Sequence, residues 1–177
     1  EGIMETLDKL KDLKVLVIGE AIIDQYHYCV PMDTSRKSGV VAYKHLSEES
    51  FAGGALAVAS HVAGLCNNVS LVTVTGNDGQ YEGFIRKVME PRIKIHNFAR
   101  KDSSTIIKRR YIFDNKKNFE ICFMNDTPIS KALENKVAAC VRKYAPKHDL
   151  VIVVDFGHGF LTDEVVRSIC RNSRYLA

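Results

Sequence analysis

The stretch Lys14–Asp24, KVLVIGEAIID, opens with a continuous run of apolar residues that ends in glycine. Such a run is typical of a strand that is buried on both faces, as in a parallel sheet. Glu20 and Asp24 follow the run, so two carboxylates are expected just past the carboxyl end of this strand. Open α/β sheets bind their ligands at that edge, which makes Asp24 a candidate for accepting hydrogen bonds from sugar hydroxyls.

The segments on either side of this stretch predict an α/β fold. The runs LVTVT and LVIVVD repeat the buried-strand pattern, and helical patterns separate the apolar runs, which favours a parallel sheet. Two segments, 25–46 and 104–124, instead alternate apolar and polar residues and predict antiparallel strands with one solvated face. The apolar runs lie at 71–75 and 150–155, and the expected helices at 1–11, 54–65, 81–89, 129–144 and from 162 onwards.

Composition excludes several classes of protein. Hydrophobic residues make up 46% and charged residues 26%, as in ordinary globular chains, and a net charge of +4 is too small to indicate nucleic-acid binding. The basic run Lys108–Arg110 is either a solvated strand face or part of an anion site. No run of apolar residues is long enough to span a membrane, and no signal peptide opens the chain.

The cysteines predict a reducing, cytoplasmic location. There are five, an odd number, without a CxxC pair, so neither a disulfide framework nor a zinc motif is expected. Three of them have apolar neighbours and are expected to be buried: Cys122, Cys140 and Cys170.

Two glycine-containing segments could approach a ligand. The segment Phe51–Ala55, FAGGA, places a glycine pair at the start of an expected helix, where free backbone N–H groups can face a ligand. The segment Asp155–Gly159, DFGHG, directly follows an apolar strand, and its His158 could meet a phosphate. Taken alone, the glycine pair could be a tight turn, Asp24 a turn or cap residue, and His158 a surface histidine.

In order and spacing, these features resemble the ribokinase/PfkB-type carbohydrate kinases, and most nearly the kinase domain of bacterial heptose-phosphate kinases. The similar segments are VLVIGEAIIDQYHYC, FAGGALAVASHVAGL, VSLVTVTGNDG, STIIKRRYI and LVIVVDFGHGFL. The resemblance implies a three-layer α/β/α fold in which residues 1–177 form one partial kinase domain. The segments near 25–46 and 104–124 would form a lid, through which many members also form homodimers.

The resemblance also implies roles for individual residues. Asp24 matches the carboxylate that binds sugar hydroxyls, and Gly53 and Gly54 match the glycine pair of the same pocket. Lys108 and Arg109 match the lid strand beside the sugar. The residues expected near the transferred phosphate are Asp155, His158 and Gly159.

The chain departs from the family pattern at several points. Ala57 stands where an asparagine is usual, His158 where heptose-phosphate kinases have lysine, and DTSR at 33–36 replaces their Arg-Ile-Ser-Pro segment. The GAGD segment that carries the catalytic base does not occur in these residues. No catalytic residue and no metal ligand is therefore expected in this chain, and negligible phosphoryl transfer is expected from it alone.

Two hypotheses for function follow. In the first, the chain is the amino-terminal portion of an ATP- and Mg²⁺-dependent carbohydrate kinase that acts on a sugar or sugar phosphate, in the synthesis of nucleotide-sugar or polysaccharide precursors. A nucleotidyltransferase domain often follows such kinase domains. In the second, the chain is a non-catalytic module that binds sugar or dimerises. Neither hypothesis requires nucleic acid or a membrane.

Overall fold

A computed structural model describes residues 2–34 and 39–177 and shows two sheets of four strands each. The first is parallel, and its strand order is β5-β4-β1-β8. Each of the three predicted apolar runs forms one of its strands, which confirms the predicted parallel sheet. Strand β5 was not predicted, because its sequence KIHNFAR lacks a continuous apolar run and it lies at the edge of the sheet. The strands are β1 (Lys14–Gly19), β4 (Asn68–Gly76), β5 (Lys94–Arg100) and β8 (Leu150–Val154).

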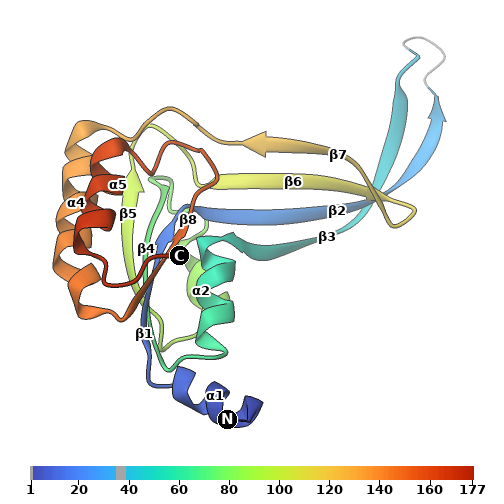
Figure 1. Ribbon diagram of the computed structural model, residues 1–177. Helices are drawn as coiled ribbons and strands as arrows, with labels where there is room; N and C mark the ends of the chain where they lie inside the picture. Colours follow the sequence, from blue (N-terminus) through green and yellow to red (C-terminus); the bar gives the residue numbers. More distant parts are fainter. Residues whose placement is uncertain (1, 35–38) are drawn as a thin grey trace.

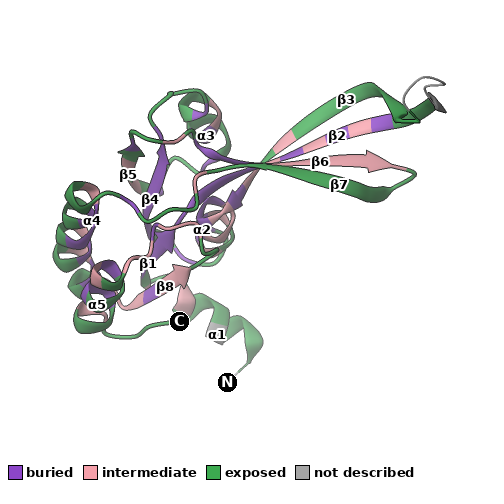
Figure 2. Ribbon diagram, turned by 90° about the horizontal axis from the view of Figure 1, so that it is seen from above, coloured by how far each residue is buried: buried purple, intermediate pink, exposed green. Residues whose placement is uncertain are grey.

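Helices cover both faces of the parallel sheet, which makes the body three-layered (Figure 1). Alternate residues of β1 enter opposite cores: Val15 and Val17 pack toward α2, whereas Leu16 and Ile18 pack toward α4 and α5. These strand residues are almost fully buried, as Figure 2 shows. The helices are α1 (Ile3–Leu10), α2 (Ala55–Ala63), α3 (Glu82–Val88), α4 (Lys131–Tyr144) and α5 (Asp163–Asn172), with a short 3₁₀ turn, η1 (Ala145–Lys147).

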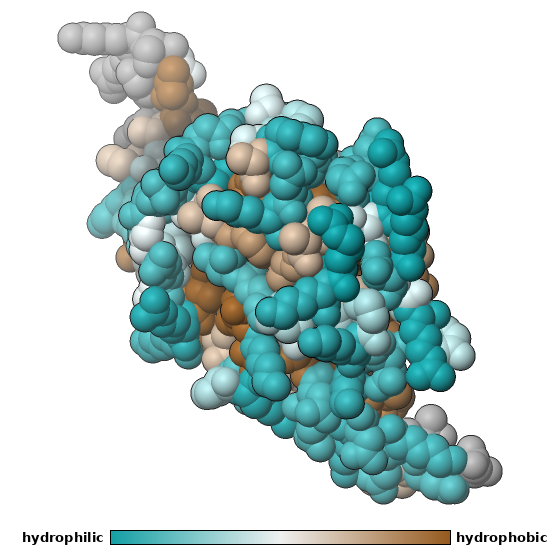
Figure 3. Space-filling view, turned by 90° about the vertical axis from the view of Figure 1, so that its left-hand side faces the viewer, coloured by the Kyte–Doolittle hydropathy of each residue, from teal (hydrophilic) through white to brown (hydrophobic). Residues whose placement is uncertain are grey.

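The side of the molecule that carries α4 and α5 is mostly hydrophilic, with apolar atoms visible between the polar side chains (Figure 3). Both helices bury one face: Val137 and Val141 of α4 and Val165 and Ile169 of α5 lie in the core. No helix in the described ranges is long and apolar enough to cross a bilayer.

The second sheet extends away from the body as a long ribbon (Figure 1), and we call it the projecting sheet. Its order is β3-β2-β6-β7, and its outer pairs are antiparallel, as predicted. Its central pair, β2 and β6, is parallel, because both strands leave the body at the carboxyl edge of the parallel sheet and run outward together. The strands are β2 (Ala21–Thr34), β3 (Val41–Gly54), β6 (Ile106–Phe113) and β7 (Lys116–Phe123).

Strands β2 and β3 are longer than the segment 25–46 predicts. Only Glu20 separates β1 from β2, and β3 continues to the start of α2. Asp24 pairs with Phe51, and Gly53 pairs with Ile22, so Asp24 and Gly53 are strand residues and not turn or cap residues.

The end of the chain lies beside β8. The backbone N–H of Val151 donates to the carbonyl of Tyr175 at 2.9 Å, and that of Val153 donates to Ala177 at 2.9 Å. Leu176 and Val151 form a parallel bridge. The residues after α5 therefore align with the parallel sheet.

The prediction that three cysteines are buried is wrong for two of them. Cys122 and Cys170 are exposed and Cys140 is half-buried, whereas Cys29 and Cys66 are buried. Cys122 lies on β7, the edge strand of the projecting sheet, whose residues are all exposed. Cys170 lies on the solvent side of α5. Apolar neighbours in sequence do not bury a residue when its element has a solvated face.

Candidate functional site

Asp24 lies on β2 close to the parallel sheet, and its carboxylate is held by Arg110. The Arg110 guanidinium donates a hydrogen bond to Asp24 Oδ1, and its Nε lies 2.7 Å from Glu120 Oε2. Burial disfavours the charged form of Arg110, but the two carboxylates outweigh this effect and raise its pKa. Burial likewise opposes ionisation of Glu120, but a hydrogen bond from Cys122 and the charge of Arg110 lower its pKa overall. The three side chains form a charged row across β2, β6 and β7.

The glycine pair packs against this row. A Cβ atom on Gly53 would lie 2.2 Å from Asp24 Oδ2, so only glycine leaves room for the carboxylate there. Gly54 has a φ of +56°, which disfavours other residues, and its Cβ would lie 2.5 Å from the carbonyl oxygen of Glu20. That carbonyl accepts a 2.9 Å hydrogen bond from the N–H of Ala55, the first residue of α2. The pair thus joins Asp24 closely to the start of α2.

Lys108 and Arg109 face opposite sides of the projecting sheet, because successive side chains of a strand alternate. Lys108 pairs in register with Asp24, and its Nζ lies 5.0 Å from the ring centroid of Phe156. Arg109 lies on the other face, where its Nε donates to Gln25 Oε1 at 2.9 Å. The structure therefore brings Lys108, but not Arg109, to the Asp24 face.

Arg110 was not predicted as a site residue from the sequence. It was included only as part of the basic run Lys108–Arg110. The signal was available in the alternation, since the residue two positions after Lys108 must share its face when the strand is regular.

The buried carboxylate of Glu20 holds the loop at 155–160 in place. This carboxylate is fully buried, and its two oxygens accept hydrogen bonds from the N–H groups of Phe156 and Phe160, both at 3.4 Å. The Glu20 side chain thus stabilises the loop, whereas Asp24 lies on the projecting sheet itself. Asp155 is exposed, and its Oδ1 accepts from the N–H of Gly157 at 2.8 Å.

The other two loop residues expected near the transferred phosphate, His158 and Gly159, lie against the body. The carbonyl of Gly159 accepts a 2.9 Å hydrogen bond from Ile129, beside the start of α4. His158 lines a cavity of about 20 Å³ with Glu20 and Arg100, enough space for about one water molecule. Its Nε2 is buried and has no hydrogen-bond partner among the described residues.

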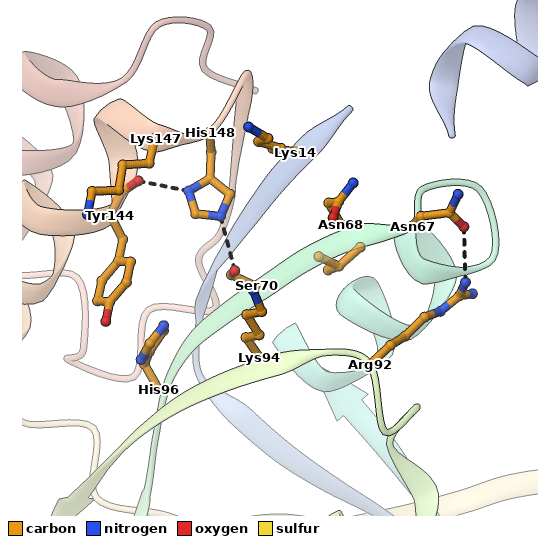
Figure 4. A pocket seen from close by; sticks show the side chains of 11 residues that line it. Lys14, Asn67, Asn68, Ser70, Arg92, Lys94, His96, Tyr144, Lys147 and His148 are labelled. Carbon is orange, nitrogen blue, oxygen red and sulfur yellow. Dashed lines mark hydrogen bonds between the residues drawn. The ribbon is translucent and has the colours of Figure 1, made fainter. Parts of the chain in front are cut away.

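Two larger cavities lie away from the predicted site residues. One, of about 440 Å³, is at the amino-terminal edge of the parallel sheet and is lined by basic residues such as Lys14, Lys94 and Lys147 (Figure 4). There His148 bridges the Tyr144 carbonyl at 2.7 Å and Ser70 Oγ at 3.0 Å. The other, of about 550 Å³, lies beside Glu134 and Asp163. Neither includes Asp24. The candidate site is the Asp24 face of the projecting sheet, which meets the 155–160 loop where Lys108 lies over the Phe156 ring.

The structure describes some of the departures from the family pattern. Ala57 is half-buried in the first turn of α2, three residues after Gly54. Residues 35 and 36 of the DTSR segment fall outside the described residues.

Comparison with known proteins supports the resemblance. No family model matches the chain. It is 24% identical over 166 residues to the bifunctional protein HldE of Hyphomonas neptunium, covering 93% of this chain and 34% of that protein. It is 30% identical over 150 residues to HldE of Hydrogenovibrio crunogenus, covering 84% and 30%. It is 27% identical over 154 residues to the D-beta-D-heptose 7-phosphate kinase of Bordetella bronchiseptica, covering 87% and 49%.

Solved structures agree on the fold. The tetrameric inhibited form of phosphofructokinase-2 from Escherichia coli superposes with a TM-score of 0.66 at 9% identity, covering 93% of this chain and 54% of that one. A carbohydrate kinase from Agrobacterium tumefaciens superposes with a TM-score of 0.50 at 17% identity, covering 80% and 45%. The chain thus spans about a third of the bifunctional relatives and about half of the kinases. It is a homologue of HldE and heptose 7-phosphate kinase proteins and has the ribokinase-like fold of the PfkB-type sugar kinases.

Proposed function

We propose that the protein containing this chain is an ATP-dependent carbohydrate kinase, and that the Asp24 face holds its sugar. The observation that carries the proposal is the contact between Asp24 and Gly53. A carboxylate lies on a backbone that has no room for a side chain, at the carboxyl edge of a parallel sheet. On this proposal, residues 1–177 form one part of a kinase domain, and the projecting sheet is its lid.

Asp24 is suited to accept hydrogen bonds from sugar hydroxyls, because an ionised carboxylate is an acceptor only and has several lone-pair sites. Arg110 donates a hydrogen bond to one of its oxygens and orients the group. Since Asp24 Oδ2 lies against Gly53, the sugar would lie across the glycine pair.

A phosphorylated sugar is the best candidate for the substrate. Lys108 supplies a positive charge on the same face, and one relative of the chain is a heptose 7-phosphate kinase. Phosphofructokinase-2, which shares the fold, has been solved in complex with fructose-6-phosphate. A role in supplying precursors of nucleotide sugars would fit a phosphorylated product.

ATP and Mg²⁺ would be the co-substrate and the metal of the whole protein. Phosphoryl transfer relies on positioning and on stabilising charge, and this chain would contribute the positioning of the acceptor sugar. Asp155, His158 and Gly159 would lie nearest to the transferred phosphate. We assign the catalytic base to none of these residues. Five free cysteines agree with a cytoplasmic location.

A homodimer formed through the projecting sheet is also part of the proposal. Strand β7 exposes a row of apolar side chains on one face, namely Phe119, Ile121 and Phe123. A contiguous apolar row on an edge strand is costly to leave in water, and a second copy of the chain would cover it.

Steady-state phosphorylation assays with the full-length protein, ATP and Mg²⁺ would test the proposed activity. Heptose 7-phosphate, fructose 6-phosphate and the unphosphorylated sugars form the panel. We expect turnover with a sugar phosphate, and we expect Asp24→Asn to lower kcat/KM at least about 100-fold, because the lost acceptor bonds involve a charge. Asp78→Asn, in an exposed turn, is the matched control. Unchanged kcat/KM in Asp24→Asn would refute the assignment of Asp24.

The non-catalytic alternative is favoured by one observation. The Asp24 carboxylate already binds Arg110, so the charged row could be a structural element of a sugar-binding or dimerising module. Calorimetric sugar binding without turnover in the full-length protein would support that alternative over the kinase.

A further inference from the structure

The face of the projecting sheet opposite Asp24 carries a cluster of two histidines and a glutamate. One ligand-type atom each from His27, His45 and Glu48 lies within 4.8 Å of the other two. His27 Nδ1 is 3.4 Å from Glu48 Oε2, and His45 Nε2 is 3.8 Å from the same oxygen. The geometry points to a site for a divalent transition metal, with zinc the best match, held by these three side chains.

The two distances to the Glu48 oxygen are close to those of tetrahedral coordination. Zinc binds histidine nitrogen and carboxylate oxygen at about 2.0–2.2 Å, so two ligands of a tetrahedral ion lie about 3.3–3.5 Å apart. The 3.4 Å separation already meets this value, and the 3.8 Å separation requires only a small rotation of exposed side chains. Two imidazoles and one carboxylate leave the fourth position open to water, and imidazole ligands favour zinc, copper or nickel over magnesium or calcium.

A β-bulge brings the three residues to one face. His27 pairs directly with Glu48, and Cys29 pairs with His45, while the register shifts between these pairs so that Leu46 is the extra residue. In a regular strand, residues three apart point to opposite faces. The inserted residue restores His45 to the side of Glu48, which is the kind of redirection that bulges produce. No sequence motif reveals the cluster, because two strands and a bulge build it.

The surroundings hold the first ligand in place and leave the other two accessible. The side chain of His27 is 11% exposed, and its ring packs on Tyr111, which in turn stacks on Phe119 at 4.5 Å between centroids. His45 and Glu48 are 49% and 61% exposed, so an ion can reach them from solvent. Arg109 is a cation on this face, but Gln25 and the Phe123 ring hold its guanidinium.

Metal titration of the full-length protein tests the inference. The first measurement is competition for Zn²⁺ against a chromophoric chelator, and the second is the visible spectrum of the Co²⁺ complex, which reports tetrahedral coordination. We expect one ion per chain with tetrahedral Co²⁺ bands. His45→Ala and Glu48→Gln, both at exposed positions, should each weaken binding at least about tenfold, a loss that even outer-shell changes can cause.

Two further variants keep the inference falsifiable. Insertion of one residue between Tyr28 and Cys29 gives Leu46 a partner, which removes the bulge and turns His45 to the opposite face while all three ligands are retained. This variant should abolish the Co²⁺ bands while circular dichroism shows a folded protein. His61→Ala, which removes an exposed histidine of α2, should bind zinc like the unaltered protein. The inference is overturned by absent Co²⁺ bands, by unchanged affinity in His45→Ala and Glu48→Gln, or by an equal loss in His61→Ala. Kinase activity is not part of the readout, so its absence would leave this test intact.

Discussion

The body and the projecting sheet are both built on β-strands, but they differ in how far those strands are buried. The body strands are continuous apolar runs buried on both faces; in β1, four successive residues are at most 1% exposed. The projecting sheet alternates its side chains and has little cover, and every residue of β7 is exposed. Burial on both faces leaves no room for charged groups, so the body supplies rigidity while the projecting sheet carries the candidate chemistry.

The largest expected effect comes from comparing a buried residue of the body with an exposed residue of the projecting sheet. Leu16→Ala, at a fully buried position of β1, should lower the free energy of unfolding by about 2–5 kcal/mol, because it removes apolar contacts and leaves a cavity. Val41→Ala on β3, 47% exposed, should cost less than about 1 kcal/mol. Urea denaturation followed by circular dichroism measures both. Equal losses would mean that the projecting sheet is as tightly packed as the body.

A smaller effect is expected where the two regions meet. Gly53→Ala would press a methyl group onto the Asp24 carboxylate, so we expect a loss of about 1–3 kcal/mol in stability and weaker sugar binding by calorimetry. Gly83→Ala is the matched control, since a Cβ there meets no atom within 4 Å and helix α3 would gain from alanine. If Gly53→Ala behaves like Gly83→Ala, the glycine is not needed to accommodate Asp24.

The smallest effect concerns the charged row on the projecting sheet. Arg110→Gln should cost about 1 kcal/mol at pH 7, more than the few tenths expected for Arg86→Gln, whose ion pair with Glu82 is exposed.

The charged row also has a pH dependence with a definite sign. The lowered pKa of Glu120 means that its contribution is present above the usual carboxyl pKa of 4.5 and is lost as the pH falls through the folded-state value. Arg110→Gln should flatten stability in this acid range, as thermal melts between pH 3 and 7 would measure. An unchanged profile would show that Arg110 does not hold Glu120 ionised.

Local patterns in the sequence were sufficient to predict much of the fold. Apolar runs identified β1, β4 and β8, and alternation identified the projecting strands, because burial on two faces or one leaves a direct mark on composition. The same logic failed for β5, an edge strand without a continuous apolar run, and for Cys122 and Cys170, whose apolar neighbours did not bury them.

The sequence by itself determined the parallel body, the projecting strands and the ordered motifs that place Asp24 and the glycine pair at one edge. Only the tertiary structure decided which side chains meet there. Register put Lys108 and Arg110 with Asp24 and turned Arg109 away, and the buried Glu20 became the anchor of the 155–160 loop. A bulge gathered His27, His45 and Glu48. Face and partner depend on strand pairings between distant segments, and a one-residue shift in register reverses them.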